Sequence, residues 1–234
     1  MKNKKKELAL KLGFWSSVYL IILCLLYGFG LISVITNYGI PKWDGLSSYI
    51  DFSKHSSFCA YKICMVTSML AAPVFTVLAC SIHEMAEEHN KLLSFISVCF
   101  SIAFASIVSI VYFMQFTMIP SSIMNGNFEG LNQLILLNQN SFAALLAVLG
   151  YNFFLGLSTL FLAFVFKETS INIWIKGSFL LTGIFCMIAL LAYILNQVEL
   201  AVYSAGIYNT SLIFASALLG IKYYKILNHF DLVT

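Results

Sequence analysis

The sequence predicts an all-α, polytopic membrane protein whose six transmembrane helices form one bundle. Of its 234 residues, 60% are hydrophobic and 10% are charged, whereas soluble domains carry about 25% charged residues. The mean hydropathy is +0.90. The charged residues also leave long uncharged stretches, and a helix needs about 20 apolar residues to cross a bilayer. This composition excludes a soluble enzyme, a nucleic-acid-binding protein and a disordered chain.

Each uncharged stretch begins and ends at charged or strongly polar residues. The first lies between Lys11 and Lys42, the fourth ends at Lys167, and the polar segment 196–199 separates the last two. We therefore expect a single transmembrane domain over residues 1–234. Its spans are predicted at about 14–36, 58–81, 92–118, 141–166, 177–196 and 200–221.

The lysines indicate an orientation. All 13 basic residues are Lys. With a cytoplasmic N-terminus, ten of them fall in inner segments, and the outer segments hold Lys42, Lys54 and Lys62. Inner loops carry the excess of positive charge in membrane proteins, so both termini are expected inside. The missing Arg disfavours enzymes that hold phosphate through bidentate Arg contacts.

Small residues predict where the helices meet, because close backbone approach drives helix association in lipid. In the third span they recur every four residues, as Ser97, Ser101, Ala105 and Ser109. We expect this stripe to pack against other helices. Between the third and fourth spans, the apolar segment 131–137 favours a short helix in the membrane interface.

No Asp, Glu, His or Lys lies near the middle of a predicted span. Proton relays and ion-coupled pumps need such a group, so these classes are disfavoured. Amides and tyrosines remain, with Lys62 and Glu199 near the outer boundary as a potential ion pair. The hypothesis is an outward-facing polar pocket among spans two to six, formed by Lys62, Gln115, Tyr151, Asn152, Asn196, Glu199, Tyr208 and Asn209, with further hydroxyls from Tyr112 and Tyr203. The alternative is that each amide bonds a neighbouring helix.

No metal or cofactor site is predicted. His83 and His89 are six residues apart, whereas two zinc-binding His residues on one helical face lie four apart. The six cysteines contain no Cys-x-x-Cys pair and are interpreted as small hydrophobic residues. No catalytic motif is present, so the protein is not expected to be an enzyme.

Two apolar segments carry a loose resemblance to a group of bacterial proteins. They are the run Tyr112-Phe113-Met114-Gln115, with Pro120 closing the third span, and the run from Gly150 to Leu157 in the fourth. In these segments the chain resembles small uncharacterised six-helix membrane proteins of bacteria. The resemblance implies a bacterial plasma membrane and carries no activity.

The leading functional hypothesis is a non-enzymatic membrane protein that binds or senses an apolar or lipid-like ligand in the outward-facing pocket. A bundle packed solid around Gln115 and Asn152 would contradict it. One alternative is the membrane subunit of a transporter that works with a separate ATPase. A second is a lipid-modifying enzyme. Expected partners are the lipid bilayer, the ligand and, as an open alternative, another protein or a second copy of the chain, but no nucleic acid.

Overall fold

In the computed structural model the chain is a bundle of long helices, and the structure describes residues 2–39, 42–167 and 170–231. These residues contain no β-strand. Six helical segments are long and apolar enough to cross a membrane, which is the architecture of a multi-pass membrane protein. The helices and helical turns are α1 (Lys2–Tyr38), α2 (Leu46–Lys54), α3 (Ser57–Met85), η1 (Glu88–Asn90), α4 (Lys91–Phe116), α5 (Met118–Met124), η2 (Leu131–Gln133), α6 (Phe142–Val148), η3 (Leu149–Leu155), α7 (Gly156–Ala163), α8 (Ser170–Ile194) and α9 (Val198–Asp231).

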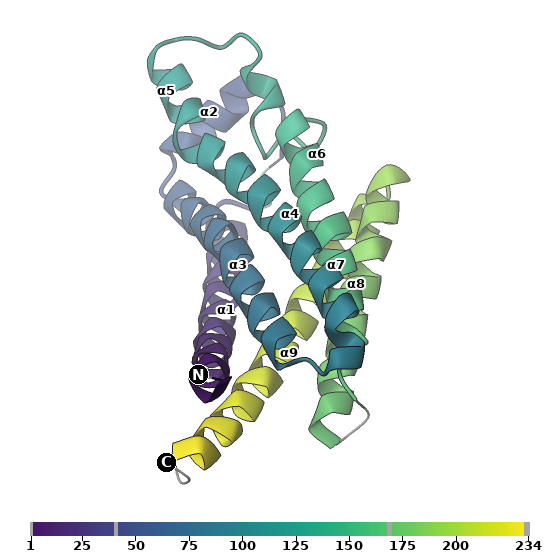
Figure 1. Cartoon of the computed structure of the whole chain (residues 1–234). Helices are drawn as coiled ribbons and strands as arrows, with labels where there is room; N and C mark the ends of the chain where they lie inside the picture. Colours follow the sequence, from purple (N-terminus) through teal and green to yellow (C-terminus); the bar gives the residue numbers. More distant parts are fainter. Residues whose placement is uncertain (1, 40–41, 168–169, 232–234) are drawn as a thin grey trace.

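Figure 1 shows both chain ends at the same end of the bundle. We call this the terminal end; the opposite end, which carries α2, α5 and the segment 125–141, is the loop end. The spanning segments are α1, α3, α4, the continuous run α6–η3–α7, α8 and α9. Helix α9 packs along α8 and also contacts α1. Because α9 is the last helix, this contact places the first and last spanning segments next to each other.

The prediction of six spans is confirmed, but the helices do not end where the uncharged stretches end. The first spanning segment runs from Lys4 to Tyr38 and the last from Glu199 to Asn228. Lys and Glu are good helix formers, so the backbone stays helical after the sequence has become polar.

A small hydrophobic cluster closes the loop end. Tyr49 of α2, Ile119 of α5, and Leu131 and Ile135 of the following segment are buried against one another. The prediction of a short helix over residues 131–137 is wrong, because η2 is one 3₁₀ turn followed by irregular chain. Its apolar side chains are buried in this cluster, so the segment does not need a lipid-facing helical side.

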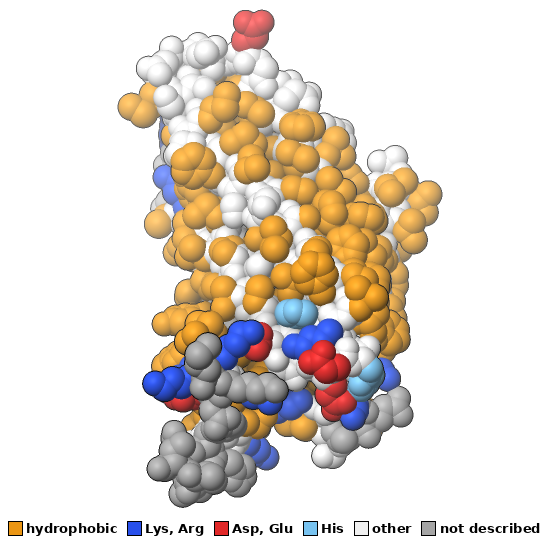
Figure 2. Space-filling view, in the orientation of Figure 1, with side chains coloured by type: hydrophobic (Ala, Val, Ile, Leu, Met, Phe, Trp, Pro, Cys, Tyr) orange, Lys and Arg blue, Asp and Glu red, His pale blue; other side chains and the backbone are white. Residues whose placement is uncertain are grey.

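Charged side chains gather at the terminal end, below a flank that is largely hydrophobic (Figure 2). Polar contacts at this end join segments that are far apart in the sequence. Lys5 of α1 pairs with Glu84 of α3 at 2.9 Å, and Lys167 pairs with Glu87 at 2.6 Å. The Ser81 hydroxyl of α3 donates to the Ala9 carbonyl of α1 at 2.7 Å.

Candidate functional site

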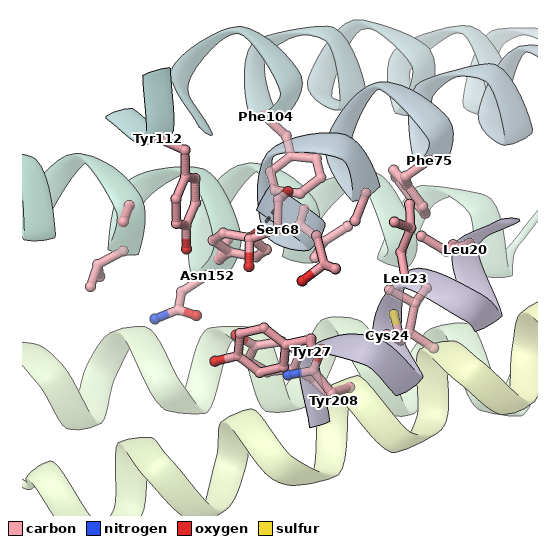
Figure 3. Close-up of a pocket in the computed structure, with 18 residues that line it drawn as sticks. Leu20, Leu23, Cys24, Tyr27, Ser68, Phe75, Phe104, Tyr112, Asn152 and Tyr208 are labelled. Carbon is pink, nitrogen blue, oxygen red and sulfur yellow. Dashed lines mark hydrogen bonds between the residues drawn. The ribbon is translucent and has the colours of Figure 1, made fainter. Parts of the chain in front are cut away.

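A cavity of about 220 Å³ lies near mid-depth in the bundle. It is large enough for a small ligand, since engineered cavities of about 150 Å³ bind benzene. Figure 3 shows its walls converging from several helices. The lining residues come from α1 (Leu20, Leu23, Cys24, Tyr27), α3 (Thr67, Ser68, Ala71, Phe75), α4 (Phe104, Tyr112), α6–η3 (Ala147, Val148, Tyr151, Asn152, Leu155) and α9 (Tyr208, Asn209, Leu212).

The cavity is uncharged and polar mainly on one side. On α1, Tyr27 lies nearer the loop end than Leu20, and on α4, Tyr112 lies nearer the loop end than Phe104. Figure 3 shows the same separation, with Tyr112 at one side of the cavity and Leu20 at the other. A ligand with an apolar body, and with a small polar group on the side toward the loop end, would match this lining.

Residues 149–155 form a π-helix, η3, inside the fourth span. Its turns are wider than those of an α-helix, and such turns are frequent at functional sites. Tyr151 and Asn152 both lie in η3 and both line the cavity. Gly150 permits the close packing of this segment, because a Cβ atom there would lie 2.8 Å from a Val108 methyl of α4.

The hydroxyl of Tyr151 is held in place by the bundle. It donates to the Ser68 carbonyl of α3 at 3.1 Å, and its ring packs edge-on against Phe104 with centroids 5.1 Å apart. The Asn209 side chain donates to the Ala205 carbonyl of its own helix at 3.0 Å. That bond uses one of its two amide N–H groups and leaves its oxygen as a potential acceptor for a ligand.

Four of the eight predicted pocket residues lie together around this cavity: Tyr151, Asn152, Tyr208 and Asn209. The prediction that spans two to six form the pocket differs from this lining in two respects. The first span contributes four lining residues, including Tyr27, and α8 contributes none among those described. Because the pocket was predicted among spans two to six, Tyr27 of the first span was missed. The sequence signal that could have identified it is a tyrosine, with its polar hydroxyl, inside an otherwise apolar stretch.

Gln115 lies outside the cavity. Its side chain is 4% exposed and bonds the backbone of the segment that follows α5. Its Nε2 donates to the Leu134 carbonyl at 2.8 Å, and its Oε1 accepts from the Leu136 amide at 3.1 Å. The bundle is therefore packed around Gln115 and hollow beside Asn152.

Asn196 is exposed and ends helix α8. Its φ is 57°, in the left-handed region. Its backbone N–H donates to the Tyr193 carbonyl at 3.1 Å, and that of Gln197 donates to the Ala192 carbonyl at 2.7 Å. This pair of bonds is the Schellman arrangement of a helix C-terminus, in which Gly or Asn occupies the left-handed position.

The conformation of Asn196 leads to a stability prediction. Asn196→Ala is expected to lower the free energy of unfolding by about 1–2 kcal/mol, because a Cβ without a local hydrogen-bonding group disfavours left-handed backbone. Asn196→Gly is the matched control and should cause no loss. Unfolding of the purified variants in mixed micelles measures both changes, and equal stabilities for the two variants would contradict the assignment.

Lys62 and Glu199 are both exposed. Lys62 lies over the Phe58 ring one turn away, with its ammonium 5.1 Å from the ring centroid. No ion pair joins Lys62 to Glu199 within the described ranges. Tyr203 is 70% exposed on the outer surface of α9. None of these three side chains lines the central cavity.

The small-residue stripe lies on the inner side of α4 in its first half. Ser97 and Ser101 are fully buried. Ser97 and Ser158 of α7 each donate to the other's backbone carbonyl, at 2.8 and 2.9 Å, and the Ser101 carbonyl accepts from Thr76 of α3 at 3.0 Å. Ala105 and Ser109 are half-buried.

No protein-family model matches the chain, and neither a curated protein nor a solved structure does. Among the described residues no group of three or more His, Cys, Asp or Glu side chains is placed to hold a metal ion. Function is therefore argued from the cavity itself.

Proposed function

We propose that the protein is a non-enzymatic, multi-pass protein of the bacterial plasma membrane that binds an uncharged, lipid-like ligand in the central cavity. Its termini are placed in the cytoplasm, so that the loop end and the polar side of the cavity face outward. The excess of lysine in the segments at the terminal end supports this orientation.

The observation that carries the proposal is the lining of the cavity. Five of the spanning segments surround it, and every lining residue is uncharged. Four tyrosine hydroxyls and two amides supply hydrogen-bonding groups beside Leu and Phe side chains. Such a mixture of apolar walls and few polar groups is typical of small-molecule sites. An ionised ligand would find no counter-ion there, and burial of an unpaired charge is costly.

The proposal is tested with two probes that have the same alkyl chain, 1-dodecanol and dodecanoate. The protein is delipidated, exchanged into amphipol and unfolded thermally with each probe. At about pH 8, well above ordinary carboxyl pKa values, dodecanol is expected to raise Tm and dodecanoate to have little effect. Saturation at about 100 times Kd corresponds to about 2.7 kcal/mol of stabilisation.

Variants that fill the cavity connect this effect to the site. Ala71→Phe on α3 and Ala147→Phe on α6 each add a ring at the lining and should abolish the dodecanol shift. Ser106→Phe is the control, because Ser106 is exposed and lies outside the lining. Two results would contradict the proposal: an unchanged shift in both filled variants, or equal stabilisation by the two probes.

A further inference from the structure

A second cavity, of about 280 Å³, lies at the terminal end. It is bounded by the end of α3, the segment after α7, the start of α8 and the last third of α9. It shares no lining residue with the central cavity. Its described lining also contains charged side chains, which the central cavity lacks, so the two cavities suit different chemistry.

Lys222 of α9 supplies a half-buried positive charge to this cavity. Its ammonium donates to Asn172 Oδ1 at 2.8 Å and lies 5.2 Å from the centroid of the Phe166 ring. Both partners are neutral. An ammonium has three N–H donors, and a buried charge is stabilised most by an opposite charge. Among the residues that the structure describes, Lys222 therefore retains donor capacity and has no carboxylate partner.

The described lining contains one carboxylate, that of Glu87, and it is already paired. Glu87 accepts from Lys167 at 2.6 Å. This hydrogen bond lowers the pKa of the Glu87 carboxyl, so Glu87 stays ionised at neutral pH. Because Lys167 compensates Glu87, the described lining keeps one net positive charge, at Lys222.

We propose that the terminal-end cavity binds a phosphate group, with the Lys222 ammonium as its cationic contact. The Asn172 side chain, whose oxygen accepts from Lys222, offers its amide N–H groups as further donors. Lys is a common phosphate ligand as a point charge. The phosphate group could belong to either of two ligands: the headgroup of a membrane lipid or a free phosphate anion.

The experiment uses the delipidated full-length chain and three probes. They are dioctanoyl phosphatidylglycerol, dioctanoylglycerol, which has the same chains without phosphate, and inorganic phosphate. Native mass spectrometry and calorimetric titration measure their binding. We expect a phosphate-bearing probe to bind and dioctanoylglycerol not to compete with it. Binding of the phospholipid alone assigns the site to lipid headgroups, whereas binding of inorganic phosphate that displaces the phospholipid assigns it to free anions.

Two variants of the same charge change test the role of Lys222. Lys222→Gln should weaken phosphate binding by about tenfold or more, since hydrogen bonds to charged groups contribute about 1.5–3 kcal/mol. Lys225→Gln removes a lysine that is exposed one turn away on α9 and lies outside the lining. A surface charge of this kind contributes little, so its effect should be about twofold at most.

Asn172→Asp separates loss of the site from loss of the fold. It places a carboxylate beside the Lys222 ammonium, so phosphate binding should be lost while Tm stays equal to or above that of the unmodified protein. The proposal is overturned if no phosphate-bearing probe binds. It is also overturned if Lys222→Gln and Lys225→Gln weaken binding equally, or if Asn172→Asp binds as well as the unmodified protein.

Discussion

Replacement of Gly183 by alanine is expected to destabilise the bundle by about 1–3 kcal/mol, the usual range for overpacking a filled interior. A Cβ atom on Gly183 of α8 would lie 2.7 Å from Leu160 Cδ2 and 2.9 Å from the Gly156 carbonyl oxygen. The second contact involves backbone, which a rotamer change does not relieve. Helices α7 and α8 would therefore have to move apart. Unfolding of the purified protein in mixed micelles measures the loss.

Gly177 provides the matched control on the same helix. Apart from its two chain neighbours and the backbone of its own helix, no atom lies within 4 Å of the place its Cβ would occupy. Alanine is also the better helix former by up to about 1 kcal/mol. Gly177→Ala should therefore leave stability unchanged or raise it. Destabilisation of similar size at both positions would show that the α7–α8 contact is not the cause.

Replacement of Gln115 by leucine is expected to release the segment 131–141 at the loop end. The Leu134 carbonyl and the Leu136 N–H would both lose their hydrogen-bond partner. A buried polar group left unpaired costs about 1–3 kcal/mol, and these backbone groups are partly buried, so we expect about 1–3 kcal/mol for both together. Hydrogen–deuterium exchange measures the effect as faster exchange of the Leu136 amide.

The same substitution at Gln139 controls for the added apolar side chain. Gln139 lies in the same segment and is exposed; its backbone carbonyl, which accepts from the Tyr193 hydroxyl, is retained in the variant. Gln139→Leu should leave exchange at Leu136 unchanged. Unaltered protection of Leu136 in Gln115→Leu would exclude Gln115 as the anchor of this segment.

The number and order of the spans could be predicted from sequence because hydrocarbon imposes a length and an apolar composition on any helix that crosses it. The site was predictable only in part. Gln115 and Asn152 are both amides in apolar stretches, yet one bonds the backbone of a distant segment and the other lines a cavity. That difference depends on how the helices cross, which composition does not encode.

Two further features depend on local backbone geometry that the apolar pattern does not contain. The π-helix at Leu149–Leu155 changes which side chains of the fourth span face inward. The sequence of this segment does not reveal it, because its apolar residues are equally typical of an ordinary α-helix. Asn196 was predicted as a pocket residue because it is polar and lies at the end of a span. A helix C-terminus also favours Asn, and in the structure that is its role.

The hydrophobic cluster at the loop end also constrains the order of assembly. Tyr49 precedes α3 and α4 in the chain, whereas Ile119, Leu131 and Ile135 follow them. Transmembrane helices insert individually before they associate. The two halves of the cluster therefore meet only once α3 and α4 lie side by side in the bilayer. We therefore expect the cluster to form late in folding, and its protection from exchange to report that the helices have paired correctly.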